Sequence, residues 1–208
     1  MSRSPVVSIR DVDHIRRALA DEQVIALPGV GGYCLAAWAD RERAVQRLEE
    51  RSGRGDESRP HYVVGHRDQA QAVTSAWPEE ARRLADRCWP GPLTLILAGP
   101  GQEPVRVSMA SSRPLRRLCQ GSGPWRIATL GDTSAATVAD HFSEADVTLV
   151  VDGGVCDGPG ATLVDCTRGT VQVIREGALP ANFIEAALIM GDPRRRWFAK
   201  RTGISGAP

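Results

Sequence analysis

The stretch Trp89-Pro90-Gly91-Pro92-Leu93-Thr94-Leu95-Ile96-Leu97-Ala98 separates a predicted helix from a predicted strand. The helix is expected to start at Pro78, because Glu79 and Glu80 follow it and acidic side chains are favoured in the first turn. It must stop within the quoted stretch, since proline cannot continue a helix. The continuous apolar run that ends the stretch, from Leu93 to Ala98, then predicts a strand.

Helices and strands alternate on both sides of this stretch. Further helices are predicted over residues 10–21, 39–51, 115–119, 134–142 and 180–190. Further strands are predicted over residues 23–27, 62–64, 105–107, 127–130, 147–151, 161–165 and 171–174. The late strands lie close together in the sequence, which favours a mixed sheet over an all-parallel one. The pattern therefore predicts an α/β or α+β fold.

The length and composition are those of one globular domain. The chain has 208 residues, of which 42% are hydrophobic and 25% charged. These values allow a sizeable core and exclude a collagen-like or wholly disordered chain. We expect one domain over residues 1–190, followed by a flexible basic tail over residues 191–208. The formal net charge of +1 excludes a uniformly basic surface.

The sequence carries no signal for a membrane or for secretion. No apolar run approaches the roughly 20 residues of a membrane helix, and residues 1–10 lack an apolar signal core. The five cysteines form no Cys-x-x-Cys pair, which argues against a disulfide framework and a zinc site. We therefore expect a cytoplasmic protein with free thiols, no metal site and no membrane contact.

The common enzyme motifs are absent from the sequence. Gly29-Val30-Gly31-Gly32 follows a predicted strand, where phosphate-binding loops lie, but it lacks the third glycine of a dinucleotide fingerprint. There is no P-loop and no G-x-S-x-G nucleophile motif. Arginines in loops remain as candidates, because guanidinium groups bind phosphate or carboxylate through two hydrogen bonds. Arg54 is flanked by glycines, and Arg175 follows a predicted strand.

Several segments together resemble the YrdC/YciO family, which includes the threonylcarbamoyl-AMP synthases. Residues 89–97 are similar to the family's W-P-G-P-L/V-T segment. The other similar segments, in the family's order, are Val24–Tyr33, Ser52-Gly53-Arg54, Asp152-Gly153-Gly154, Ala161-Thr162-Leu163-Val164-Asp165 and Ile174-Arg175-Glu176-Gly177. The resemblance implies a single domain in which a twisted, mixed α/β sheet with flanking helices surrounds a concave, positively lined cavity.

The resemblance also implies a reaction. Family members use L-threonine, bicarbonate and ATP with Mg2+: the amine takes up CO2, the carbamate oxygen attacks the α-phosphorus of ATP, and pyrophosphate leaves. The product modifies tRNA with the help of partner proteins, and related modules bind double-stranded RNA. Such a reaction depends on positioning and on charge stabilisation. By resemblance, the partners here would be ATP, L-threonine, bicarbonate and RNA.

The resemblance assigns roles to a small set of residues. The candidates for nucleotide and phosphate binding are Arg54, Arg175, Thr162, Thr129, Arg51 and Ser52, and Tyr33 is expected in the cavity wall. The basic tail supplies the candidates for RNA contact, which are Arg194, Arg195, Arg196, Lys200 and Arg201.

The chain departs from the family pattern mainly at polar positions. Gly29 and Gly31 occupy the positions of the threonines of P-T-x-T, and Ser52 occupies that of the lysine of K-x-R. Ser108-Met109-Ala110 replaces R-[VM]-P, and Ala128-Thr129-Leu130-Gly131 replaces S-x-A-N. Arg51 lies next to the missing lysine, and Arg106 is two residues out of register with the missing arginine. Thr129 and Thr133 are the hydroxyls that could partly replace the missing serine and asparagine.

Three functions stay open at this stage. The protein could be a diverged protein that binds nucleotide or RNA, with the authentic synthase reaction weakened or lost. It could instead be an active enzyme that forms a carbamoyl adenylate from ATP, bicarbonate and an amino acid. It could also be a protein-interaction module. Each uncompensated loss of a group that stabilises the transition state costs roughly 10²–10³ in rate, which favours the first hypothesis for the authentic reaction.

Overall fold

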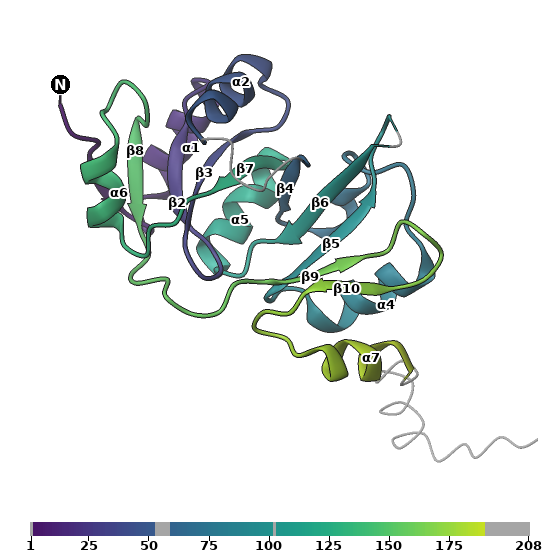
Figure 1. The fold of residues 1–208 in the computed structure, drawn as a ribbon. Coiled ribbons are helices and arrows are strands. Elements are labelled where there is room, and N and C mark those ends of the chain that lie inside the picture. The colour runs from purple at the N-terminus through teal and green to yellow at the C-terminus, as the bar shows by residue number, and fades with distance from the viewer. Residues whose placement is uncertain (1, 53–58, 102, 190–208) are drawn as a thin grey trace, which may run out of the picture.

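One mixed sheet of ten strands forms the centre of the computed structural model, which describes residues 2–52, 59–101 and 103–189 (Figure 1). The strands are β1 (Val6–Ser8), β2 (Ile25–Pro28), β3 (Tyr33–Trp38), β4 (His61–Val64), β5 (Leu93–Ala98), β6 (Pro104–Met109), β7 (Trp125–Thr129), β8 (Leu149–Asp152), β9 (Thr162–Asp165) and β10 (Gln172–Arg175). Their order across the sheet is β1-β8-β2-β3-β7-β4-β6-β5-β9-β10. The sheet contains parallel pairs such as β5 with β9 and antiparallel pairs such as β5 with β6, which confirms the predicted mixed sheet.

Helices flank this sheet. They are α1 (Val12–Ala20), α2 (Glu42–Arg51), α3 (Arg67–Ala70), α4 (Glu79–Cys88), α5 (Arg113–Ser122), α6 (Ala135–His141) and α7 (Ala181–Ile189). Helix α4 follows Pro78 at its N-cap and ends directly before Trp89, as predicted. The strand predicted over Leu93–Ala98 is β5, and it is buried along almost its whole length. Among the described helices, none is long and apolar enough to cross a membrane.

The glycine-rich stretch after β2 is the turn of a β-hairpin. Strand β3 follows it and pairs antiparallel with β2, and the Gly29 N–H donates to the Gly32 carbonyl oxygen at 2.9 Å. The stretch follows a strand, as predicted, and it connects that strand to a second strand. Strand β3 was not predicted, since it is apolar on both faces and shows no alternation.

The sheet carries helices unequally on its two faces. One face, which we call the opposite face, carries Leu35 and Val107; α2 and α6 cover it beside β3, and α4 and α7 cover it beside β5. The other face, which we call the cavity face, carries Cys34 and Arg106. Helices α1 and α5 pack on the cavity face of β8, β2, β3 and β7, in a core that includes Leu118.

The cavity face of β6, β5 and β9 has no covering helix in the part of the chain that the structure describes, whereas α5 packs beside Val63 of β4. Strand β6 shows this directly, because its side chains alternate between the two faces. Val105 and Val107 pack in the core with α4, whereas Arg106 and Ser108 line a cavity on the other face. The position of the cavity thus follows from where the helices stop.

Candidate functional site

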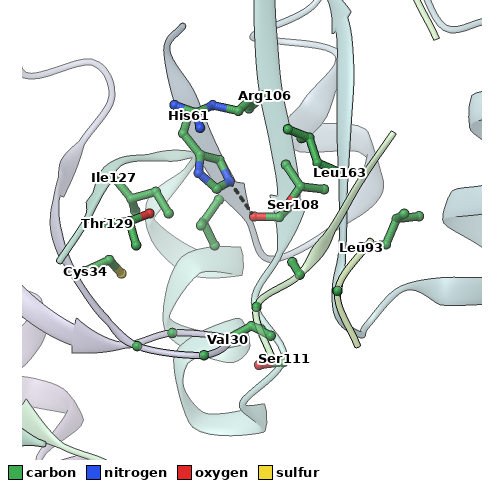
Figure 2. A pocket seen from close by; sticks show the side chains of 18 of the residues that line it. Val30, Cys34, His61, Leu93, Arg106, Ser108, Ser111, Ile127, Thr129 and Leu163 are labelled. Atoms are coloured by element: carbon green, nitrogen blue, oxygen red, sulfur yellow. Dashed lines mark hydrogen bonds between the residues drawn. The ribbon is translucent and has the colours of Figure 1, made fainter. Parts of the chain in front are cut away.

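A cavity of about 910 Å³ lies on the cavity face of the sheet, beside the start of α5. Its floor comes from β4, β5, β6, β7 and β9, and its rim comes from the β2–β3 turn and from the segments 159–161 and 174–177. Figure 2 shows His61, Arg106 and Ser108 close together, with Thr129 and Cys34 on another side and Val30 and Ser111 at the far end. The site therefore gathers segments from both ends of the chain.

Two glycines allow the rim to close. Gly31 has φ +75°, and a Cβ there would lie 2.7 Å from the Cα of Gly160. A Cβ on Gly177 would lie 2.2 Å from the Gly160 carbonyl oxygen. Only glycine permits such an approach of two backbones. The β2–β3 turn and the segment after β10 consequently meet at Gly160, and both border the cavity.

The polar part of the floor comes from β4 and β6, which are parallel neighbours. His61 lies opposite Arg106 in the register, and its Nε2 forms a hydrogen bond of 3.0 Å with Ser108 Oγ. The sequence offered the apolar–polar alternation of residues 105–108 as a signal for Arg106 and Ser108. The sequence has no such signal for the hydrogen bond between Ser108 and His61, because these residues are 47 positions apart.

Arg106 belongs to the site even though it is two residues out of register with the family's arginine. Side chains on a strand point to the same face at every second residue. A shift by two positions therefore keeps Arg106 on the cavity face, on the same side as Ser108. Its Nη2 donates to the Arg59 carbonyl oxygen at 3.0 Å, and both arginines line the cavity.

The charge that lines the cavity is predominantly positive. Arg59, Arg106 and Arg175 line it, and Glu176 is the one acidic residue among the described lining residues. Burial, together with the charges of Arg106, Arg126 and Arg175, lowers the pKa of His61 to about 3, so its imidazole is neutral near pH 7. Such a cavity favours an anionic ligand that can accept hydrogen bonds from guanidinium groups.

Arg175 and Thr129 are the predicted site residues that the structure places in the cavity. Arg175 ends β10, and its Nη2 lies 3.4 Å from the Ala161 carbonyl oxygen, which it contacts as a donor. Thr129 ends β7 and lies opposite Cys34 in the register. Both residues line the cavity, but from different sides of it.

Thr162 does not line the cavity, contrary to the expectation from the sequence. Its side chain is fully buried, and its hydroxyl donates to the Leu179 carbonyl oxygen at 2.6 Å. The same oxygen accepts hydrogen bonds from the N–H groups of Gly177 and Leu179, each at 3.0 Å. A hydroxyl with three backbone partners has no remaining capacity for phosphate. Thr162 therefore fixes the segment between β10 and α7.

Tyr33 does not form part of the cavity wall, so this prediction is wrong. Neighbouring residues of a strand point to opposite faces, and Cys34 takes the cavity face. Tyr33 is fully buried on the opposite face, where its hydroxyl donates to the Gly154 carbonyl oxygen at 3.0 Å. It accepts the Gly153 N–H at 3.3 Å. Tyr33 thus anchors the segment that follows β8.

Arg51 and Ser52 also lie away from the described cavity lining. The Arg51 guanidinium pairs with Asp146, with both Nε and Nη2 at 3.1 Å from Oδ1. The Ser52 hydroxyl donates to the Glu49 carbonyl oxygen at 3.0 Å, at the end of α2. In this structure Arg51 therefore ties the end of α2 to Asp146, and Ser52 caps a backbone carbonyl at the same helix end.

Other predicted residues lie outside the described residues. They are Arg54 and the RNA-contact candidates Arg194, Arg195, Arg196, Lys200 and Arg201. No cluster of three potential metal-ligating side chains occurs within residues 2–52, 59–101 and 103–189.

Comparison with known proteins places the chain among a group of related sequences. The family model Sua5_yciO_yrdC, described as "Telomere recombination", matches residues 17–177. The chain is 29% identical over 186 residues to the threonylcarbamoyl-AMP synthase of Pyrococcus abyssi, which covers 82% of this chain and 55% of that protein. It is 28% identical over 187 residues to the threonylcarbamoyl-AMP synthase of Bacillus subtilis, covering 82% and 54%. The chain thus spans about half the length of these curated relatives.

Solved structures show the same fold. The crystal structure of P. abyssi Sua5 complexed with L-threonine matches with a TM-score of 0.78 and 26% identity, over 91% of this chain and 61% of that one. The crystal structure of Escherichia coli YciO matches with a TM-score of 0.74 and 20% identity, over 86% and 97%. These structures confirm the predicted single α/β domain.

Proposed function

The chain belongs to the Sua5/YciO/YrdC family, and from this membership we propose that its cavity binds ATP with Mg2+, while threonylcarbamoyl-AMP synthesis is weakened or lost. The observation that carries the proposal is the convergence of Arg59, Arg106 and Arg175, from three separate segments, on one cavity of about 910 Å³. A triphosphate is the ligand that best matches several guanidinium groups in one enclosed space.

The lining supports a nucleotide that brings its own metal ion. Mg2+ is usually held by one or two carboxylates together with substrate phosphates. Glu176 is the acidic residue that the described lining offers, so the phosphates would supply most of the ligands. The protein's contribution would be the positive charge of the arginines and the shape of the cavity.

The weakening of the authentic reaction is proposed from the groups that the described lining of the cavity lacks. Lys200 is the single lysine of the chain and lies outside the described residues. Thr162, a candidate for phosphate binding, is committed to three backbone hydrogen bonds. Because each lost transition-state contact costs roughly 10²–10³ in rate, the remaining arginines would sustain binding better than catalysis.

An active carbamoyl-adenylate synthase is the second candidate, and the cavity volume favours it. Ligand pockets commonly measure roughly 300–1,000 Å³. A volume of about 910 Å³ leaves room for a small amino acid beside a nucleotide. L-threonine and bicarbonate would then be substrates, by analogy with the P. abyssi relative whose structure contains L-threonine.

Calorimetric titration with ATP and Mg2+ tests the proposal, with and without L-threonine and bicarbonate. We expect micromolar binding in the wild type and at least tenfold weaker binding in Arg175→Ala, because a charge-assisted contact is lost. Arg168→Ala is the matched control, since Arg168 is exposed in the turn after β9 and lies outside the cavity. Absence of heat at millimolar ATP would reject nucleotide binding and favour an RNA or protein partner.

Release of pyrophosphate separates the two candidates. The first predicts ATP binding with little or no pyrophosphate formed from ATP, L-threonine and bicarbonate. The second predicts pyrophosphate release that depends on an amino acid and on bicarbonate. Screening several amino acids in this assay would identify the amine substrate if the second candidate is correct.

A further inference from the structure

Ser108 lines the cavity with a hydroxyl that has one hydrogen-bond partner among the described residues. That partner is His61, whose Nε2 lies 3.0 Å from Ser108 Oγ (Figure 2). Ser108 also shares the cavity face of β6 with Arg106, two residues and about 7 Å along the strand. The hydroxyl is therefore close to the positive charge of the site and can form a further hydrogen bond.

The surroundings of His61 determine which atom of this pair donates. His61 Nδ1 is buried and has no hydrogen-bond partner in the described part of the chain. The positive charges of Arg106, Arg126 and Arg175 act on the ring and hold the pKa of His61 at about 3. In a positive potential, an unpartnered lone pair on Nδ1 is less costly than an unpartnered N–H. The proton of the neutral ring is therefore on Nε2, which donates to Ser108 Oγ.

We propose that the Ser108 hydroxyl donates to an anionic oxygen of the ligand, and that His61 is the positioning residue that directs it there. Because Ser108 Oγ accepts the Nε2–H, its own hydrogen turns away from the ring toward the cavity. The inference rests on the proposed function, since it requires that the cavity binds an anionic ligand. The anionic oxygen belongs to a phosphoryl group of ATP or to the carboxylate of an amino acid such as L-threonine.

The arrangement compensates for a departure from the family pattern. Ser108 occupies the position where the resemblance places an arginine, and Arg106 supplies the charge one step along the same face. A hydroxyl donor cannot replace a guanidinium by charge, but it can complete the set of donors around an anionic oxygen. The pair thus gives this chain its own means of orienting the ligand.

Titration calorimetry with Mg-ATP and, separately, with L-threonine tests the inference. We expect Ser108→Ala to weaken binding of one of these ligands about tenfold, and that ligand identifies the anionic group. His61→Leu should cause the same loss, because it removes the Nε2–H donor. His61→Gln should recover most of the lost affinity, since its Nε2–H can take the same place. In the double variant Ser108→Ala/His61→Leu, the loss should not exceed that of Ser108→Ala alone.

Nitrogen-15 NMR of the His61 ring measures which ring nitrogen carries the proton, and a merely structural role of His61 would not determine this. We expect the neutral tautomer with the proton on Nε2 at pH 7, and the opposite tautomer would overturn the inference. Unchanged affinity of Ser108→Ala for both ligands would overturn it as well, while the proposed function would stand. If the wild type bound neither ligand, the proposed function itself would fail, and this inference with it.

Discussion

The two halves of the sheet differ in what covers their cavity face. Beside β2, β3 and β7, helices α1 and α5 cover it, and β2 and β3 are apolar on both faces. Beside β6, β5 and β9, the described residues provide no such helix, and Arg106 and Ser108 lie on the uncovered face of β6. Both halves belong to one continuous sheet. The candidate site thus lies where the described residues provide no second layer of core.

This difference indicates that residues that stabilise the fold and residues that could bind a ligand lie in different halves of the sheet. A strand that is covered on both faces contributes apolar surface to two cores at once, so its substitution affects folding. A strand that is covered on one face has a second face free for polar groups. The predictions below compare matched substitutions in the two halves.

The largest effect is expected from Leu35→Ala in β3. Leu35 is fully buried between α2, α6 and the sheet, and truncation of a buried leucine costs about 3 kcal/mol. Leu163→Ala, in β9, removes the same atoms from the lining of the cavity, where the side chain is only half-buried. We expect this second change to cost less than about 1.5 kcal/mol. Urea unfolding measures both, and equal losses would contradict the comparison.

Thr162→Val is expected to have the next largest effect, and it acts on stability. The substitution removes a buried hydroxyl and leaves the N–H groups of Gly177 and Leu179 without their acceptor. An unsatisfied buried donor costs about 1–3 kcal/mol, so we expect a loss of about 2 kcal/mol in unfolding free energy. Affinity for Mg-ATP, measured by calorimetry, should change less than threefold. A large loss of affinity at unchanged stability would instead restore Thr162 as a phosphate ligand.

The sequence predicted the framework better than the site, for a physical reason. The strand Leu93–Ala98 and the helix before it follow from local composition and from proline, which act over a few residues. The hydrogen-bond partners of Thr162 depend on where the backbone of Gly177 and Leu179 lies, and no local sequence pattern predicts that. Tyr33 was assigned to the cavity wall by resemblance to the family, whereas the face on which it lies depends on how β3 pairs in the sheet.

The site residues that sequence analysis missed share one property. Arg106 was considered only as an arginine out of register, although a shift of two residues preserves its face on a strand. His61 and Ser108 meet because β4 and β6 are parallel neighbours, which is a property of the sheet order. Predicting a contact between side chains of two strands therefore requires the strand order of the sheet. Predicting the individual helices and strands mostly does not.

Arg106 and Arg126 lie on opposite faces of the sheet, on β6 and β7, which are separated by β4. Arg106→Ala should weaken Mg-ATP binding about tenfold, because it removes a charge from the cavity. Arg126 instead pairs with Glu49 at 2.9 Å and lies over the Tyr62 ring at 5.5 Å. Arg126→Ala should therefore lower stability by about 1 kcal/mol, since Glu49 is half-exposed, with a smaller effect on binding. Calorimetry and urea unfolding of both variants test this, and interchanged effects would contradict the assignment of faces.

The smallest effect is a dependence of stability on pH that originates in the cavity. The pKa of His61 is about 3 in the folded protein because of burial and of Arg106, Arg126 and Arg175, and its ordinary value is 6.5. Between these values the unfolded chain binds more protons than the folded one, so stability falls as the pH drops through this range. From pH 7 to pH 6 we expect a loss of about 0.7 kcal/mol that His61→Gln lacks, measured by urea unfolding.

Ligand binding should sharpen this last effect. Phosphates among the arginines would offset the positive charge that lowers the pKa of His61, so the folded protein would bind a proton more readily. With saturating Mg-ATP, the pH-dependent difference between the wild type and His61→Gln should therefore shrink. A difference that is unaffected by Mg-ATP would show that the phosphates lie far from His61. The same titration thus reports where in the cavity the negative charge of the ligand lies.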